Sequence, residues 1–328
     1  MKKEHMIVLG LGLALVGAAV TWEVVGGLPK PMRVEITKET LKIGLSRPTI
    51  WIFLNDSDTN SRSWSDFMAR SSSAINIPIL NLFYQTITKH NGDKYRIEVV
   101  GGLQRVAELM GGWDKLPTLM RNPKARINGP EEDWIRTALL AKYGGLWLSP
   151  SVVCLRPFGD LPANKVVAFG QDTVPMYGSA VPGFRALWSP KAEHPIFVEW
   201  EARIRNRLEF QNGGRQVRGD AKSDWVDLTT SALAGEGEVE VRVKEELGRD
   251  PRTNKSLDLE QIFAAGTQGR LPFTIPPAAV YMPVPYGDLL DRRAFGWILK
   301  SSEEQIMESD LAIRYVLEGS LNSGMRAM

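Results

Sequence analysis

Short apolar runs separated by polar turns dominate the chain beyond residue 47. The run Pro48–Leu54 is largely apolar and is followed by the polar segment 55–60, a pattern that predicts a buried first strand. Similar runs predict further strands at Arg96–Val100, Leu146–Leu148, Val152–Leu155 and Val166–Phe169. Patterning and end signals predict helices over Glu131–Tyr143, His194–Phe210 and Glu303–Leu317, the last of them amphipathic. Strands alternating with helices indicate an α/β sheet.

Three other segments carry weaker signals. Ile77–Leu82 is mostly apolar, and its pattern does not select a helix or a strand. Glu236–Lys255 is highly charged and is expected to be a solvated excursion, whereas the proline-rich segment Leu271–Tyr286 is expected to be an ordered loop because apolar residues interleave with its prolines. No internal repeat is visible.

The N-terminus differs from the rest of the chain. Met6–Trp22 carries no charge, follows Lys2 and Lys3, and is just long enough to cross a bilayer. A cleaved signal peptide and a buried helix are alternatives, but Val24 and Val25 extend the run and favour an uncleaved signal anchor. We therefore expect an anchor over residues 1–25, contacting the lipid bilayer through residues 6–25, and a stem over 26–47. The basic flank predicts a cytosolic N-terminus and a body across the membrane.

Composition narrows the function classes. The 328 residues (36.5 kDa) carry 40 basic and 38 acidic side chains, and this balance argues against a dedicated nucleic-acid binder. The single cysteine, Cys154, excludes an internal disulfide and any multi-cysteine metal site. The three histidines lie far apart in sequence and form no close-spaced ligand pair.

One stretch, Glu132–Phe158, contains the most informative pattern. On a helix, Asp133 and Arg136 share a face, so they can point together into a site or form a surface ion pair. Gly144 and Gly145 allow the chain to reverse after the helix without a Cβ clash and to return as a strand.

This stretch resembles the glycosyltransferases of capsular-polysaccharide synthesis and of the initiating α-1,6-mannosyltransferase type, which carry an Asp-x-Asp motif. The matching positions lie in register: Asp133, Arg136, Leu140, Tyr143, Gly144, Gly145, Trp147 and Leu148. Val280–Pro283 is similar to a later strand of that family. The resemblance implies a single GT-A-like, Rossmann-like nucleotide-sugar-binding domain over residues 48–300, followed by a C-terminal helix and tail over 301–328.

The sequence departs from that family at the motif itself, because Ser149 and Ser151 stand where the family has two aspartates that hold Mn²⁺ or Mg²⁺. A serine hydroxyl is a weak, neutral ligand for a hard cation, so tight metal binding at these positions is expected to be lost. Three alternatives follow. The enzyme is metal-independent and uses basic residues such as Lys142 or Arg156; another carboxylate such as Asp56, Asp160 or Asp172 binds the metal; or the fold is retained without activity.

For the active alternatives, the resemblance implies transfer of a sugar from a nucleotide-sugar donor to a glycan or glycoconjugate hydroxyl, with retention at the anomeric carbon. Asp133, Arg136, Ser149 and Ser151 would hold the donor sugar. Ile50, Trp51, Phe53 and Asn55, at the end of the first strand, would hold the nucleotide. A donor available across the membrane places such an enzyme in a Golgi-type lumen, with a cytosolic body as the alternative. The rival function is an inactive glycosyltransferase-like component of a membrane or viral assembly.

Overall fold

The computed structural model describes residues 47–55, 77–123, 125, 127–173, 180–211, 220–234, 238–252, 256–266 and 271–322. Its strands are Thr49–Leu54 (β1), Arg96–Gly101 (β2), Gly145–Leu148 (β3), Val152–Cys154 (β4), Val166–Thr173 (β5), Ala180–Ser189 (β6), Val239–Arg242 (β7) and Tyr281–Pro283 (β8). Its α-helices are Pro78–Asn91 (α4), Gly102–Met110 (α5), Gly129–Tyr143 (α6), Pro195–Gln211 (α7), Ala221–Ala234 (α8), Leu259–Ile262 (α9), Tyr286–Asp291 (α10), Glu303–Glu308 (α11) and Ala312–Leu321 (α12).

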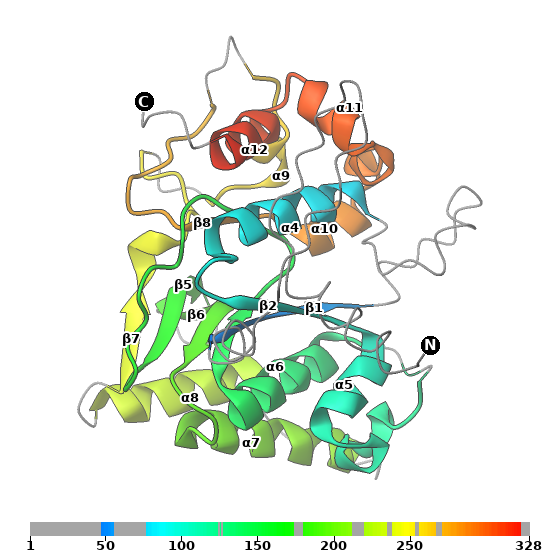
Figure 1. Ribbon diagram of the computed structural model, residues 1–328, viewed down its shortest axis with the longest axis vertical. Helices are drawn as coiled ribbons and strands as arrows, with labels where there is room; N and C mark the ends of the chain where they lie inside the picture. Colours follow the sequence, from blue (N-terminus) through cyan, green and yellow to red (C-terminus); the bar gives the residue numbers. More distant parts are fainter. Residues whose placement is uncertain are drawn as a thin grey trace, which may run out of the picture.

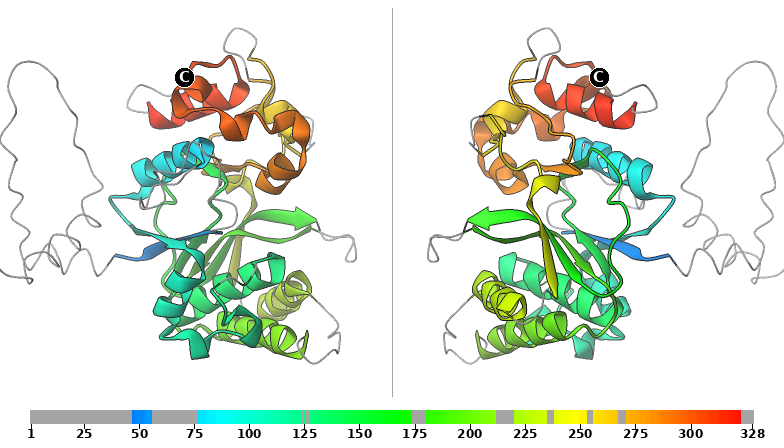
Figure 2. Two further views of the ribbon diagram at one scale, coloured as in Figure 1. Left: turned by 90° about the vertical axis from the view of Figure 1, so that its right-hand side faces the viewer. Right: turned by 90° about the vertical axis from the view of Figure 1, so that its left-hand side faces the viewer.

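A mixed six-stranded sheet in the order β2-β1-β3-β6-β5-β7 lies at the centre of the molecule (Figure 1). β1 is parallel to both β2 and β3, whereas β6 runs antiparallel to its neighbours β3 and β5. Helices α5–α8 lie on one side of this sheet, and α4 with α9–α12 lie on the other, as Figure 2 shows from two further directions. The protein is therefore an α/β protein with a helix-flanked mixed sheet.

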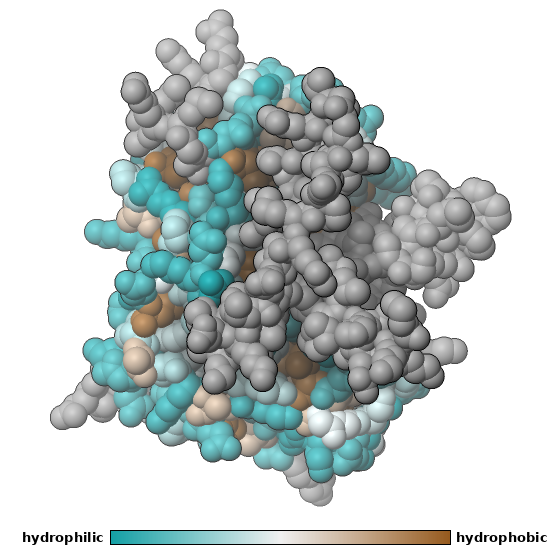
Figure 3. All heavy atoms as spheres, in the orientation of Figure 1, coloured by the Kyte–Doolittle hydropathy of each residue, from teal (hydrophilic) through white to brown (hydrophobic). Residues whose placement is uncertain are grey.

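Both faces of β1 are buried, which explains why its sequence is apolar without alternation. Trp51 and Phe53 pack in a core shared with α5–α8, while Ile50 and Ile52 pack in a second core that includes β4 and Tyr281. A third core joins α4 to the C-terminal helices. On the face shown in Figure 3, the described surface is mostly hydrophilic and its hydrophobic residues form small, separate groups.

The predicted glycine turn joins α6 to β3. Gly144 and Gly145 have φ angles of +68° and +94°, which only glycine adopts at low cost. A Cβ on Gly145 would lie 2.4 Å from the Thr49 carbonyl oxygen. The Trp51 indole Nε1 donates to the Gly144 carbonyl at 2.8 Å and ties this turn to β1.

The strands predicted within residues 48–54, 96–100, 146–148, 152–155 and 166–169 are confirmed, as are the helices predicted over 131–143 and 194–210. Capping explains the start of α6, because the Asn128 backbone N–H donates to the Glu131 carboxylate at 2.9 Å and Pro130 occupies the first turn. The unassigned run from Ile77 begins helix α4.

Two predictions are wrong. The segment 236–255 is not simply a solvated excursion, because it contributes β7, with Val239 buried beside Val166 and the charged residues Glu240 and Arg242 paired with each other. The helix predicted over 303–317 is two helices. Residues between α11 and α12 pair instead with the segment after α9, where the Gly266 N–H donates to the Asp310 carbonyl at 2.6 Å.

The predicted anchor and all of the predicted stem except Arg47 lie outside the described residues. Within the described ranges, no helix has the length and apolar character needed to cross a membrane.

Candidate functional site

The carboxyl ends of the parallel strands β1 and β3 meet at one edge of the sheet, which is where ligands bind in many open α/β sheets. Asn55 follows β1 and Ser149 follows β3 at this edge. The Asn55 amide Nδ2 donates to the Ile127 carbonyl at 3.1 Å, so the loop before α6 also lies here. The first turns of α6, which carry Asp133 and Arg136, therefore belong to the same edge.

Asp133 and Arg136 form a largely buried ion pair, with 3.0 Å between Asp133 Oδ1 and Arg136 Nη1 and exposed side-chain fractions of 20% and 7%. The guanidinium lies 5.4 Å from the ring centroid of Trp147 on β3 and 5.1 Å from that of Phe184 on β6. Its Nη1 faces the Asp133 carboxylate, whereas its buried Nε has no hydrogen-bond partner among the described residues. A buried arginine N–H without a partner costs free energy unless a ligand completes it, so the pair is a candidate binding site.

Lys222, in the first turn of α8, brings a second cation to this pair. Its ammonium lies 5.3 Å from the Phe184 ring centroid. Burial raises the pKa of the Asp133 carboxyl, while the charges of Arg136 and Lys222 act in the opposite direction. No local sequence pattern pointed to Lys222 or Phe184, because both are far from the motif along the chain.

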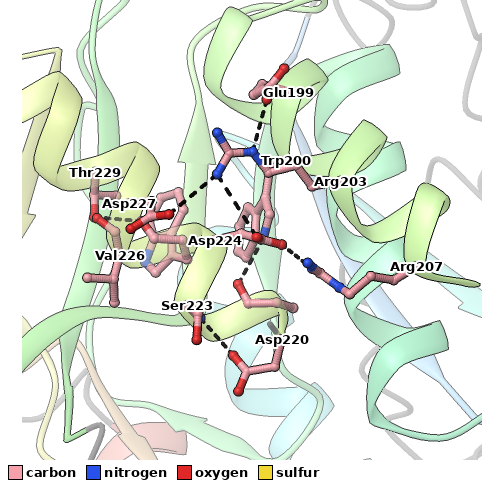
Figure 4. A network of polar contacts seen from close by, with 12 residues as sticks. Glu199, Trp200, Arg203, Arg207, Asp220, Ser223, Asp224, Val226, Asp227 and Thr229 are labelled. Carbon is pink, nitrogen blue, oxygen red and sulfur yellow. Dashed lines mark hydrogen bonds and ion pairs between the residues drawn. The ribbon is translucent and has the colours of Figure 1, made fainter. Parts of the chain in front are cut away.

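A network of ion pairs holds α8, and hence Lys222, against α7 (Figure 4). Asp224 of α8 pairs with Arg207 of α7, and the Asp220 carboxylate accepts from the Ser223 N–H at 2.7 Å and caps α8. The indole rings of Trp200 and Trp225 stack at 4.6 Å between the two helices.

Ser149 and Ser151 lie in the turn between β3 and β4, with 3.1 Å between their hydroxyl oxygens. The Ser149 N–H donates to the Arg185 carbonyl of β6 at 2.9 Å, and the Ser151 carbonyl accepts from Val284 at 2.8 Å. The two serines that replace the aspartates thus form a neutral, mutually bonded pair. This pair does not suit a hard divalent cation.

Asp160 and Asp172, the described carboxylates among those considered as substitute metal ligands, do not form a metal site together. Asp160 is nearly fully exposed and pairs with Lys94, while Asp172 pairs with Arg185. Asp56 lies outside the described residues. The described part of the chain contains no group of three or more His, Cys, Asp or Glu side chains placed to hold a metal ion. The described residues at this edge therefore do not fit the Mn²⁺ or Mg²⁺ that the resemblance implies.

A second charged cluster, which the sequence did not reveal, adjoins the serine turn. Arg185 Nη1 lies 3.1 Å from both Asp172 Oδ1 and Glu246 Oε1. The Glu246 side chain is 3% exposed and packs against Gly170, where any Cβ would overlap it. Burial is the main cause that raises the pKa of Glu246 to about 7, and the charge of Arg185 opposes it.

The residues predicted to bind the nucleotide differ in how far their side chains are exposed. Ile50, Trp51 and Phe53 are buried in the core, so in this structure they position β1, and Asn55 is the partly exposed member of the predicted nucleotide-binding group. The Lys142 ammonium donates to the Leu109 and Met110 carbonyls at 2.7 and 2.9 Å. No contact described for this side chain reaches the serine turn.

Arg156, the other basic residue considered for this role, is exposed and follows β4. Its backbone N–H donates to the Val280 carbonyl at 3.1 Å. No contact described for it reaches the serine turn.

The sequence matches no protein-family model, and a search of curated proteins finds no relative. Among solved structures, the chain is similar to the PaToxG glycosyltransferase, with 12% identity and a TM-score of 0.35 over 58% of this chain and 70% of that one. It is also similar to two structures of the glycosyltransferase GlyE from Streptococcus pneumoniae TIGR4, the apo form at 9% identity (TM-score 0.35) and another at 10% (TM-score 0.33). Each GlyE match covers 84% of this chain and 60% of that one. Similarity at this level assigns no activity.

Proposed function

We propose that the protein binds a nucleotide-sugar donor at the carboxyl edge of β1 and β3 and transfers the sugar to a glycan or glycoconjugate hydroxyl. The observation that carries this proposal is the buried Asp133–Arg136 pair, whose guanidinium Nε has no hydrogen-bond partner among the described residues. A sugar presents several hydroxyls that both donate and accept, so it can satisfy the carboxylate and the guanidinium together.

Each group has a distinct role in this proposal. Asp133 accepts hydrogen bonds from sugar hydroxyls and Arg136 donates to a sugar oxygen, while Trp147 and Phe184 exclude water from the pair. Asn55 lies where the nucleotide would enter at the end of β1. The Ser149 and Ser151 hydroxyls donate to the donor instead of to each other.

The proposed reaction exchanges one bond at the anomeric carbon for another. The bond to the diphosphate oxygen breaks, the acceptor oxygen bonds to the same face of the sugar, and the acceptor proton passes to the departing diphosphate. The rate enhancement comes from positioning and from stabilisation of the negative charge on the leaving group, so no strong protein base is required. Retention is tested by NMR assignment of the anomeric configuration of the product.

The deciding experiment measures binding and hydrolysis of a panel of nucleotide sugars, with Mn²⁺ and with EDTA. Binding that persists in EDTA, with slow release of the sugar, supports a metal-independent transferase. Absence of binding for every donor in both conditions would contradict the proposal. The Ser149→Asp/Ser151→Asp double variant should bind Mn²⁺, because it supplies the two anionic oxygen ligands that hard cations prefer.

The second candidate is a glycosyltransferase-like protein that binds a sugar ligand without transferring it, as a component of a larger assembly. The neutral Ser149–Ser151 pair favours it, because the position expected to stabilise the leaving group carries no charge. Donor binding without hydrolysis or transfer to any acceptor tested would select this candidate.

We also propose that residues 6–25 anchor the chain in a membrane, with the body in a Golgi-type lumen. The uncharged run after Lys2 and Lys3 supports this proposal. Protection of the body from added protease in sealed microsomes would agree with it. Release of the full-length chain from membranes by alkaline carbonate would refute the anchor.

A further inference from the structure

The donor proposed above carries a diphosphate, and the site needs positive charge where a metal would otherwise supply it. We propose that Arg185 binds this diphosphate beside the Ser149–Ser151 turn, and that protonation of Glu246 favours this contact by removing the net negative charge of the cluster formed by Arg185, Asp172 and Glu246. This inference rests on the proposed function and extends it to a further donor-binding residue and its control.

Arg185 lies beside the serine turn. Its carbonyl oxygen accepts the Ser149 N–H at 2.9 Å, so its main chain borders the turn that replaces the metal-binding motif. Its side chain is 43% exposed, so a ligand at the turn has access to it. Arg136, by contrast, is enclosed by aromatic rings, and Lys142 already donates to two carbonyls.

The bonding of the guanidinium is the second argument. Asp172 and Glu246 both contact Nη1, and the hydrogen bonds described for this side chain do not involve Nη2 or Nε. Two parallel N–H groups of an arginine match two phosphate oxygens, an arrangement that a lysine ammonium does not provide. The cluster therefore holds the arginine in place while leaving donors for an anion.

The setting of Glu246 is the third argument. Its carboxyl faces Arg185 from β6, Asp172 from β5 and Tyr281 from β8, and it fits against the bare Cα of Gly170. With Glu246 ionised, the three charges sum to −1 and repel a diphosphate. With Glu246 protonated, the sum is zero and Asp172 alone pairs with Arg185. Burial raises the pKa of Glu246 to about 7, so this change occurs near neutral pH.

The test measures binding of UDP-glucose and GDP-mannose by calorimetry in EDTA, at pH 6 and pH 8, using the full chain. The diphosphate of these probes keeps its charge over this range. Arg185→Gln should weaken binding by about tenfold or more at pH 6, because a charge-assisted contact is lost. Arg156→Gln is the matched control, since Arg156 is an exposed arginine beyond β4, and it should bind within about twofold of wild type.

Glu246→Gln keeps the shape of the side chain and carries no charge at either pH. The wild type should bind several-fold more weakly at pH 8 than at pH 6, and this variant should bind equally at both. Wild-type affinity in Arg185→Gln, or an unchanged pH dependence in Glu246→Gln, would overturn the inference and leave the proposed function intact. If neither these probes nor any other nucleotide sugar binds the wild type, both fail. Should Arg185→Gln not fold, the pH comparison with Glu246→Gln decides.

Discussion

Phe184 and Arg185 are consecutive residues of β6, yet their side chains join different charged clusters. The Phe184 ring lies 5.1 Å from the Arg136 guanidinium, whereas Arg185 Nη1 lies 3.1 Å from the carboxylates of Asp172 and Glu246. The β5–β6 pairing shifts register at this point, between Phe169 and Gln171. One irregular strand segment thus contributes one residue to the proposed sugar site and the next residue to the proposed diphosphate site.

Asp133→Asn should abolish detectable donor binding or reduce it by at least about tenfold, because it removes the charge that accepts sugar hydroxyls. Asn is preferred to Ala here, since Asp133→Ala leaves the buried Arg136 unpaired and should also destabilise the fold by about 3 kcal/mol. Calorimetry on both variants, with urea unfolding as the stability control, checks the prediction. Wild-type donor affinity in a folded Asp133→Asn protein would rule out this sugar site.

Glu246→Gln should change how stability depends on pH. The pKa of Glu246 is raised from 4.5 to about 7 in the folded state, so its contribution is fully present below pH 4.5 and is lost as the pH rises through about 7. The loss amounts to roughly 3 kcal/mol. His90 and His194 have lowered pKa values and act with the opposite sign, with stability rising through their titration. Urea unfolding at pH 5.5 and 8.5 should therefore show that the free energy of unfolding of the variant, relative to that of the wild type, increases with pH. Free energies of unfolding that change in parallel with pH would contradict the prediction.

Gly145→Ala should destabilise the protein by at least about 2 kcal/mol, because the residue has a positive φ and its Cβ would press on the Thr49 carbonyl of β1. Gly319→Ala is the matched control. It lies in helix α12 with nothing within 4 Å of its Cβ position, so it should stabilise by about 0.5–1 kcal/mol. Equal effects of the two substitutions in thermal unfolding would show that the turn tolerates a side chain.

Asp224→Ala should destabilise the protein by about 3 kcal/mol, because it leaves the largely buried Arg207 without its carboxylate partner. Asp227→Ala removes an exposed carboxylate 3.7 Å from Arg203 and should cost less than about 1 kcal/mol. Hydrogen exchange of α8 amides should accelerate in the first variant only. Unchanged exchange in Asp224→Ala would mean that the aromatic stack alone holds α8 on α7.

Local sequence patterns predicted much of the fold, and they predicted the Asp133–Arg136 pair of the candidate site. The apolar run of β1, the caps of α6 and the glycine pair are short-range signals, and the three-residue spacing predicted that Asp133 and Arg136 share a face. Arg185 meets Glu246, and Lys222 meets Phe184, only in the tertiary structure, where the strand order inserts β6 between β3 and β5. Periodicity contains no information on strand order. Strand β7 was missed although its residues alternate between valine and charged side chains, because the high charge of the whole segment 236–255 indicated a solvated loop.

Ser320 of α12 donates its hydroxyl proton to the Cys154 carbonyl of β4, and its oxygen lies 3.0 Å from His90 Nε2 of α4. One packing partner of helix α4, the helix α12, therefore lies more than 200 residues later in the sequence. During synthesis on the ribosome, α4 would emerge early, and the part of its apolar face that packs on α12 would stay uncovered until α12 has been made. Contacts of such long sequence separation slow folding and leave the nascent chain exposed to aggregation. The last described helix, α12, thus completes the fold. We therefore expect the chain to depend on chaperones during synthesis.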